Sequence, residues 1–495
     1  MGILKHFGRG LFVIVMLWQG VSGKVIYVDQ GAPAGGDGHS WGTAYRFLQD
    51  GLGAAKNGDK IWVTAGIYKP DQREADPNGT GLRTELFQLV NGVRLYGGFS
   101  GKEDPQTFHL ENRHVLDYET ILSGDLRDND NGAVTGKALL NDPCRDDNSY
   151  HIFKGVAITD ATRIDGFTIT GAHANGASGD SSLGGGLLNS NNSNPQLWNC
   201  RFIRNVAGRG GAIYNYRSSN RTVNTEFIEN ASVITGGAIL NGTSLVAMKM
   251  SGCTFRDCFS EGWGGAVYNN NGGLMHFEQC LFVNNKVWKY GNTQGGAICN
   301  LNSEVTAESC TFAGNISDNE GGGLRNENGT VGLVHCILWE NEDKSGTTES
   351  AQVHNLGGTV EVAYNCVMGW SGTGGEDGNF EADPLFADQS GGDVHLRSEA
   401  GRWEAVSQSW VRDGATSPCI DAGDPQAYWA DEPLSSGGRL NLGGYGGTRQ
   451  ASKSAVCTGG VDGNGRLIGD VNRDCVVNLK DLAWMAGDWL QTTVE

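Results

Sequence analysis

The sequence has little proline, few charged side chains and no long apolar run after its N-terminal segment. Because a transmembrane helix needs about 18 or more apolar residues in succession, no membrane insertion of the mature chain is expected. Proline accounts for 10 of 495 residues and charged residues for 19 %. The 77 glycines do not recur at every third position, which excludes collagen, and the plentiful aromatic and β-branched residues argue against disorder. The composition favours many short strands joined by tight Gly/Asn turns.

Positive charge is also in short supply. The chain has 37 Lys and Arg against 56 Asp and Glu, for a net charge of −19. Nucleic acids and anionic membrane surfaces would be repelled, so neither is expected as a partner. The same charge weighs against a polyanionic polysaccharide unless cations bridge it to the protein.

The N-terminus, residues 1–23, has the pattern of a cleaved secretory signal peptide. A basic start with Lys5 and Arg9 is followed by an apolar run over 11–18 and by small residues ending at Gly23. The run is too short to span a bilayer, which favours a signal peptide over a membrane anchor. The sequence therefore predicts a secreted protein, located outside the cell or at its surface.

A unit of roughly 26 residues recurs six times in the middle of the chain. One of its motifs ends in Asn, and its copies are GGGLLN (184–189), GGAIYN (210–215), GGAILN (236–241), GGAVYN (264–269), GGAICN (295–300) and GGGLRN (321–326). A second motif gives the same period, with the copies NCRFIRN, NTEFIEN, GCTFRDC, QCLFVNN, SCTFAGN and HCILWEN. Both motifs alternate with period two, and no unit has a helical pattern of ten residues. The repeat therefore predicts an all-β solenoid, a parallel β-helix whose coils are stacked ~4.8 Å apart.

Stacked coils would place equivalent side chains in ladders along the axis. The aligned phenylalanines would fill the interior: Phe202, Phe227, Phe255, Phe282 and Phe312. Asn189 through Asn326 would form a ladder of amide hydrogen bonds at a turn. The aligned cysteines are predicted to be buried free thiols, because parallel side-chain directions suit a disulfide poorly: Cys200, Cys253, Cys280, Cys310 and Cys336. Cys457 and Cys475 are better candidates for a disulfide.

A short amphipathic segment lies between the first two predicted strands. Tyr45, Leu48, Leu52 and Ala55 would share one face of a helix. Such a helix would cover the open end of the solenoid, which otherwise presents an unpaired edge.

The two repeated motifs resemble those of polymorphic outer-membrane proteins and other right-handed parallel β-helix proteins of the pectate-lyase-like superfamily. The opening IYVDQGAPAGGDGHSW and the closing DPLFAD, SPCIDAGDP and NLGGYGGT resemble bacterial secreted β-helix proteins. The resemblance implies a right-handed β-helix over residues 24–452 and an extracellular polysaccharide as ligand. In this superfamily, lyases typically use Ca²⁺ held by carboxylates with an Arg or Lys base, and glycosidases use paired carboxylates.

The tail, residues 453–495, contains one loop with the spacing of an EF-hand. Oxygen ligands at these offsets can wrap a Ca²⁺ ion, and they would come from Asp470, Asn472, Asp474, the Val476 carbonyl, Asn478 and Asp481. The loop resembles a type I dockerin repeat, which implies a cohesin-like or other cell-surface partner. The alternative is an acidic turn before an amphipathic helix.

The variable positions of the repeat supply the candidate catalytic residues. Arg201 and Glu226 are equivalent positions on neighbouring coils, as are Arg204, Glu229 and Asp257. Stacking would gather these five residues into one charged patch, of which Arg201, Arg204, Glu229 and Asp257 are the candidate catalytic groups. The alternative is a row of surface ion pairs, which contribute little to stability.

Two functions remain open from the sequence. One is an enzyme acting on extracellular polysaccharide, either a pectate-lyase-like lyase or a glycoside hydrolase. The other is a non-catalytic adhesin or glycan-binding solenoid. This function is favoured because the needs of the scaffold alone account for most of the repeated residues.

Overall fold

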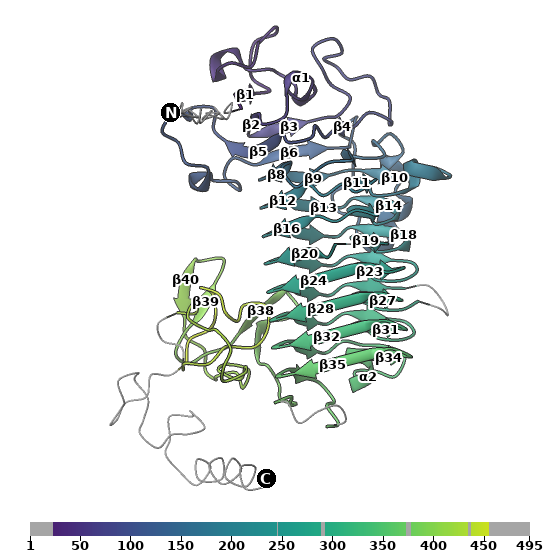
Figure 1. Cartoon of the computed structure of the whole chain (residues 1–495), viewed down its shortest axis with the longest axis vertical. Coiled ribbons are helices and arrows are strands. Elements are labelled where there is room, and N and C mark those ends of the chain that lie inside the picture. The colour runs from purple at the N-terminus through teal and green to yellow at the C-terminus, as the bar shows by residue number, and fades with distance from the viewer. Residues whose placement is uncertain (1–22, 245, 289–292, 373–377, 434–436, 455–495) are drawn as a thin grey trace, which may run out of the picture.

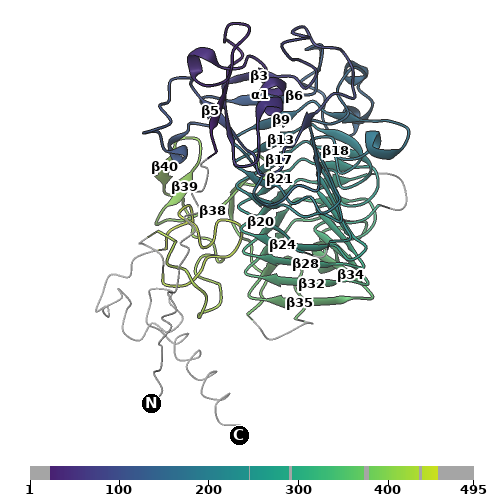
Figure 2. The same cartoon turned by 45° about the horizontal axis from the view of Figure 1, so that its top comes forward.

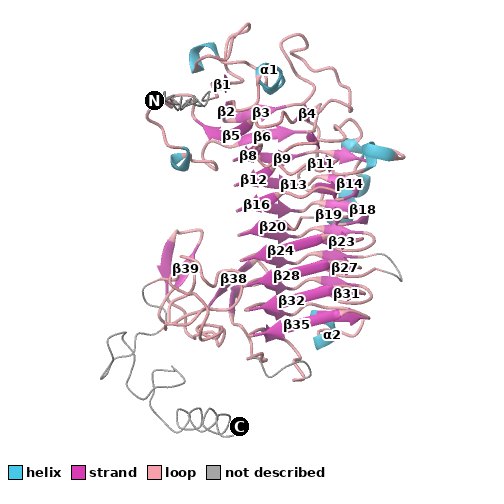
Figure 3. Cartoon of the chain, in the orientation of Figure 1, coloured by secondary structure: helices cyan, strands magenta, loops and turns pink. Residues whose placement is uncertain are grey.

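The computed structural model of the chain describes residues 23–454 apart from 245, 289–292, 373–377 and 434–436. These residues form a parallel β-helix, a column of stacked coils in which each strand pairs with the equivalent strand of the next coil (Figure 1). Strands dominate and helices are few and short (Figure 3). The predicted all-β fold class is confirmed. The predicted signal peptide, the EF-hand loop and both Cys457 and Cys475 lie outside the described residues.

Four parallel sheets run along the column, and we name them A to D. Sheet A contains β1 (Val25–Val28), β2 (Lys60–Thr64), β5 (Arg94–Phe99), β8 (Arg163–Asp165), β12 (Gln196–Trp198), β16 (Arg221–Val223), β20 (Met248–Ser251), β24 (Leu274–Glu278), β28 (Glu304–Glu308), β32 (Thr330–Val334) and β35 (Thr359–Ala363). Sheet B contains β3 (Gly66–Tyr68), β6 (Thr120–Ser123), β9 (Thr168–Thr170), β13 (Arg201–Ile203), β17 (Glu226–Ile228), β21 (Thr254–Arg256), β25 (Leu281–Val283), β29 (Thr311–Ala313), β33 (Ile337–Trp339) and β36 (Cys366–Val367).

The other two sheets complete each coil. Sheet C contains β10 (His173–Ala174), β14 (Val206–Arg209), β18 (Ala231–Thr235), β22 (Phe259–Ser260), β26 (Lys286–Val287) and β30 (Ile316–Ser317). Sheet D contains β4 (Phe87–Gln88), β7 (Phe153–Val156), β11 (Leu187–Ser190), β15 (Ile213–Tyr216), β19 (Ile239–Gly242), β23 (Val267–Asn270), β27 (Ile298–Leu301), β31 (Leu324–Glu327) and β34 (Val353–Leu356). A regular coil therefore visits sheets D, A, B and C in that order.

Glycine is required where the chain returns to sheet D. In the second repeat Gly210 has φ of +63°, which L side chains rarely adopt. A Cβ atom on Gly211 would lie 2.3 Å from the carbonyl oxygen of Gly237 in the next coil. The Gly-Gly pair of the repeated motif thus lets successive coils approach at the sheet spacing.

The predicted phenylalanine ladder fills the interior behind sheet B. Phe202, Phe227, Phe255, Phe282 and Phe312 are all fully buried. Their rings stack with centroid separations of 5.2, 4.7, 4.7 and 4.6 Å along the axis. One residue on each coil thus supplies a continuous aromatic core.

The predicted asparagine ladder is present with one interruption, but it lies within the strands of sheet D and not at a turn. Amide hydrogen bonds of 2.9 Å join Asn241, Asn269, Asn300 and Asn326 in succession. Asn215 instead donates to Asn220 within its own coil. Asn189 donates to Asn215 on the other side of this break.

A second amide ladder, which the sequence reasoning missed, lies at the turn between sheets B and C. It joins Asn205 to Asn230 and, after Cys258, joins Asn285 to Asn315, Asn341 and Gln352. The sequence feature that could have predicted this ladder is the last residue of the NCRFIRN motif. It is Asn in five of the six copies.

The five aligned cysteines are buried and free, as predicted. Their thiols form hydrogen bonds with the backbone around the turn between sheets A and B; the Cys200 thiol, for example, donates to the Trp198 carbonyl at 3.2 Å. Burial raises the pKa of Cys200 to about 12, so this thiol stays protonated.

The predicted helix covers the N-terminal end of the column. α1 (Leu48–Ala54) packs against β1, β2 and β4, with Leu48 and Leu52 buried. The second α-helix, α2 (Glu349–Gln352), lies at the other end, before β34. Five 3₁₀ turns complete the helices: Trp41–Thr43, Leu110–Asn112, Gly136–Asn141, Pro143–Arg145 and Gly179–Ser182. No helix of the described residues is long and apolar enough for a membrane span.

The C-terminal part of the described chain, residues 378–454, folds back beside the column, and we call it the C-terminal lobe (Figures 1 and 2). It contains two antiparallel pairs, β37 (Phe386–Asp388) with β38 (Asp393–Leu396) and β39 (Arg402–Glu404) with β40 (Ser409–Val411). Its apolar side chains form one cluster with the outer face of sheet B, a cluster that includes Leu281, Ala313, Ile337, Phe386, Val394, Leu396, Ile420 and Leu442. The lobe therefore covers the later strands of that sheet.

Candidate functional site

The outer face of sheet B changes character along the column. The first outward position of each strand reads Thr168, Arg201, Glu226 and Thr254 over β9 to β21, and then Leu281, Thr311 and Ile337 over β25 to β33. The C-terminal lobe buries the apolar half. Arg201, Glu226 and Thr254 on the polar half stay partly exposed.

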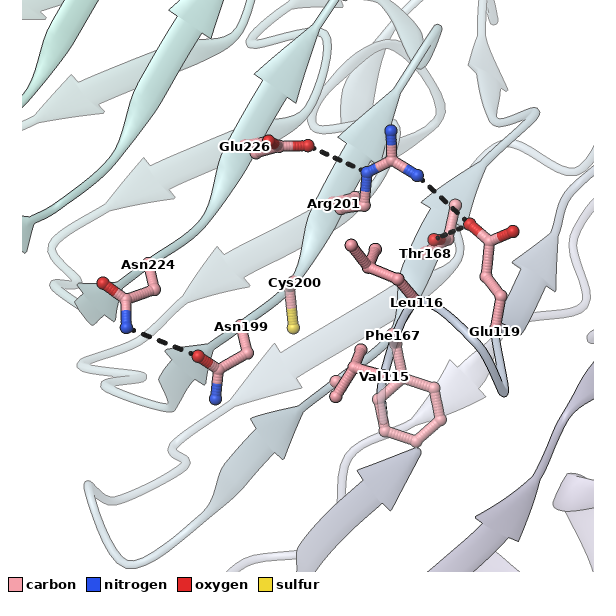
Figure 4. Close-up of a pocket in the computed structure, with 11 residues that line it drawn as sticks. Val115, Leu116, Glu119, Phe167, Thr168, Asn199, Cys200, Arg201, Asn224 and Glu226 are labelled. Atoms are coloured by element: carbon pink, nitrogen blue, oxygen red, sulfur yellow. Dashed lines mark hydrogen bonds and ion pairs between the residues drawn. The ribbon is translucent and has the colours of Figure 1, made fainter. Parts of the chain in front are cut away.

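A roofed groove lies on this polar half, with a volume of about 390 Å³. The segment after the 3₁₀ turn Leu110–Asn112 forms its roof with Val115, Leu116 and Glu119. Figure 4 shows Leu116 and Glu119 close to Arg201 and Thr168, and Val115 beside the ring of Phe167. The groove thus has an apolar side and a charged side.

Arg201 lies at the centre of the charged side. Its Nε donates to Glu226 Oε2 at 2.8 Å, and its Nη1 lies 3.3 Å from Glu119 Oε1 (Figure 4). Glu119 Oε1 also accepts a 2.6 Å hydrogen bond from Thr168 Oγ1. One guanidinium therefore bridges two carboxylates from segments that are far apart in the sequence.

Arg204 extends the polar surface toward sheet C. It has φ of +54° at the turn between the sheets, and its Nε donates to Glu229 Oε2 at 2.6 Å. The buried Arg145 holds its backbone, because Arg145 Nη2 donates to the Arg204 carbonyl at 2.8 Å. Arg145 itself pairs with Asp130 at 2.7 Å.

Asp257 follows Glu229 on the next coil, and both have positive φ at equivalent turns. Burial raises the pKa of Asp257, and the Glu229 carboxylate adds to this, while the neighbouring Arg256 opposes it. Asp257 is thus a carboxyl group of this surface with a raised pKa.

All four candidate catalytic residues lie on one face, together with Glu226. Arg201 and Arg204 each pair with the acid of the next coil, in the order that the repeat alignment gave. The sequence reasoning missed Glu119, Thr168 and Arg145. Glu119 and Arg145 come from irregular insertions before the repeats, where no periodicity relates them to a coil.

The groove does not fit a metal ion. Glu226 and Glu119 both form ion pairs with Arg201. The guanidinium therefore already occupies the position between the carboxylates where a metal ion would bind. Within the described ranges there is no group of three His, Cys, Asp or Glu side chains that could hold one.

The fold and this site define a class: a parallel β-helix protein with a roofed, ion-paired groove on one sheet. A family model described as "Disaggregatase related" matches residues 347–423, from just before α2 into the C-terminal lobe. The crystal structure of pectate lyase Pel9A is similar, at 12% sequence identity over 86% of this chain and 97% of that chain, with a TM-score of 0.41. No curated protein matches the chain.

Proposed function

We propose that the protein binds an extracellular polysaccharide in the groove over β9, β13 and β17. The observation that carries this proposal is the fixed Glu119–Arg201–Glu226 array beside the apolar Val115 and Leu116. Carboxylates and a guanidinium can exchange hydrogen bonds with sugar hydroxyls, while apolar side chains suit the C–H face of a sugar ring. The extracellular location rests on the signal-peptide pattern of residues 1–23.

Binding fits the geometry better than proton abstraction by arginine does. The Nε of Arg201 donates to Glu226 and the Nε of Arg204 donates to Glu229. Both guanidinium groups are thus placed as hydrogen-bond donors, which is the geometry of a binding site and not of a base that accepts a proton.

Polysaccharide cleavage is the second candidate function, and Asp257 is the observation that favours it. Burial raises the pKa of Asp257, and the Glu229 carboxylate lies near it on the same surface. A general acid beside an ionised carboxylate is the arrangement that glycoside hydrolysis uses. Lyase action remains part of this candidate, with the arginines as the groups to test.

Replacing Arg201 by alanine is expected to weaken glycan binding about tenfold or more, because Glu119 and Glu226 lose the partner that they share. The measurement is the affinity of the full chain on a panel of neutral and acidic polysaccharides. Arg412→Ala, an exposed arginine in the C-terminal lobe, is the matched control and should bind as the wild type does. Wild-type affinity in the Arg201→Ala variant would contradict the groove as the binding site.

The same panel separates binding from catalysis. Absorbance at 235 nm with polyuronates reports the unsaturated product of a lyase, and reducing-end assays report hydrolysis. Product formation that disappears in Arg204→Ala or Asp257→Asn would establish catalysis at this surface. Binding without any product supports the non-catalytic glycan-binding solenoid.

We also propose that the EF-hand loop of residues 470–481 binds Ca²⁺ and that the tail docks to a cohesin-like or other cell-surface partner. Its support is the ligand spacing in the sequence. Replacing Asp470, the first ligand, by alanine is expected to abolish calorimetrically measured Ca²⁺ binding by the full chain. Undiminished binding in Asp470→Ala would contradict the loop assignment.

A further inference from the structure

The outer face of sheet A carries a straight row of basic side chains. The strand register places Lys60 beside Arg94, Arg94 beside Arg163, and Arg221 beside Lys249 on adjacent strands, with Gln196 between Arg163 and Arg221. We call Lys60, Arg94, Arg163, Arg221 and Lys249 the basic column. It crosses five strand spacings, about 24 Å along the axis.

These side chains point outward and their charges are not neutralised. The residues that follow them on their strands, such as Ile61, Leu95 and Ile164, are fully buried, so the column faces away from the core. Arg94, Arg221 and Lys249 are exposed. No member of the basic column forms an ion pair with another residue in the part of the chain that the structure describes. Arginines on sheet B, by contrast, each have a carboxylate partner.

Two acids that are close in sequence to members of the basic column have other partners. Asp165, two residues after Arg163, is buried and pairs with Arg113 at 2.6 Å. Asp59, before Lys60, is also buried and accepts from the backbone N–H groups of Lys24 and Lys56. The column therefore keeps a local positive potential in a chain whose net charge is −19.

An aromatic ring lies in the middle of the basic column. Trp198 is partly exposed, and the guanidinium carbons of Arg163 and Arg221 lie 4.3 and 5.5 Å from its ring centroid. Both arginines thus form cation–π contacts with the same indole ring, which favours side-chain conformations that lie close to the sheet. Beside the polar Gln196 the indole also gives the column a surface on which a ring can pack.

The charge on sheet A reverses beyond the column. The outward residues of the later strands include Glu278, Glu304, Glu308 and Glu361. A chain-like anion would thus be attracted to one half of this face and repelled from the other, which limits a bound polyanion to the coils from β2 to β20.

From this geometry we infer that the basic column binds a linear acidic polysaccharide, one that carries carboxylate or sulfate groups. A sugar ring is about as long as one strand spacing, so successive acidic sugars of an extended chain fall on successive strands. The column is one residue wide, which suits a single polymer chain. A single-stranded nucleic acid is disfavoured because successive bases need successive stacking rings, and among the described residues the column's arginines contact the ring of Trp198 alone.

This inference takes from the proposed function only that the ligand is a polysaccharide. The two sites are separate, because the basic column lies on sheet A and the groove on sheet B. Weaker binding in Arg201→Ala tests the groove. Weaker binding in variants of the basic column tests the inference, and either can fail alone.

The test uses the full chain with polygalacturonate as the carboxylate probe, heparin as the sulfate probe and dextran as the neutral control. The triple variant Arg94→Gln, Arg221→Gln, Lys249→Gln is expected to weaken binding of an acidic probe about tenfold and to flatten its salt dependence. The charge-matched control variant is Arg397→Gln, Arg412→Gln, Arg449→Gln, with three exposed arginines of the C-terminal lobe. Circular dichroism checks that both variants fold.

Acidic-polymer binding that is lost in the column variant and kept in the control variant supports the inference, and the two probes show whether carboxylate or sulfate is preferred. Equal weakening in both variants would overturn it, because only net charge would then matter. Wild-type affinity in the column variant, equal binding of dextran, or tighter binding of single-stranded DNA than of either acidic polysaccharide would each overturn it as well.

Discussion

Replacing Phe255 by alanine is expected to destabilise the β-helix by about 3–5 kcal/mol. Phe255 is fully buried, stacks at 4.7 Å on both Phe227 and Phe282, and contacts Phe277 edge-on. Alanine would leave a cavity in the middle of the ladder, and the rigid sheet spacing prevents the coils on either side from closing it. The measurement is the denaturant midpoint of the full chain, followed by circular dichroism at fixed pH.

Two further variants show whether the ladder is the cause. Tyr428→Ala also removes an aromatic ring, but at a position that is 71% exposed, and should change stability by about 0.5 kcal/mol or less. Phe255→Leu keeps most of the volume and should cost less than Phe255→Ala. A loss below about 1 kcal/mol in Phe255→Ala would mean that the stacked rings are not a cooperative core.

Replacing Arg113 by methionine is expected to cost about 3–5 kcal/mol, because it leaves a buried carboxylate without its counter-charge. Arg113 Nη2 lies 2.6 Å from Asp165 Oδ1, and both side chains are only 5% exposed. The guanidinium also donates to the carbonyls of Gly97 and Leu110. Arg113 thereby fastens the segment that carries Val115, Leu116 and Glu119 over the groove, so glycan affinity should fall together with stability.

Urea unfolding gives the stability change, and limited proteolysis between residues 104 and 119 reports release of the roof. The double variant Arg113→Met, Asp165→Asn removes the stranded charge and should recover part of the lost stability, since the two sites are coupled. The amide oxygen introduced by Asp165→Asn can still accept from Asn199, whose side chain donates to the Asp165 carboxylate at 3.0 Å in the wild type. A double variant no more stable than Arg113→Met would contradict the buried ion pair as the source of the loss.

The repeat made the regular part of the fold predictable. Two motifs with one period placed Phe202 through Phe312 and Asn189 through Asn326 in ladders, because equivalent residues of stacked coils must meet. The same alignment paired Arg201 with Glu226 and Arg204 with Glu229. Periodicity was enough wherever a contact joins equivalent positions.

Contacts between segments that do not occupy equivalent positions in the repeat could not be predicted from the sequence. Glu119 reaches Arg201 from an insertion that belongs to no repeat, and the C-terminal lobe meets sheet B through residues with no periodic relation to it. The basic column was missed for a different reason. Its members Lys60, Arg94 and Arg163 lie in the irregular first coils, so only the strand register shows that they are neighbours.

The C-terminal lobe has a consequence for how the chain is made. During synthesis the ribosome releases β25 to β33 before it releases residues 386–442, which cover them. In that interval Leu281, Ala313 and Ile337 are exposed to solvent. They form an apolar strip on the outer face of sheet B. We therefore expect aggregation and chaperone capture of the nascent protein to be concentrated at this strip until residues 386–442 cover it.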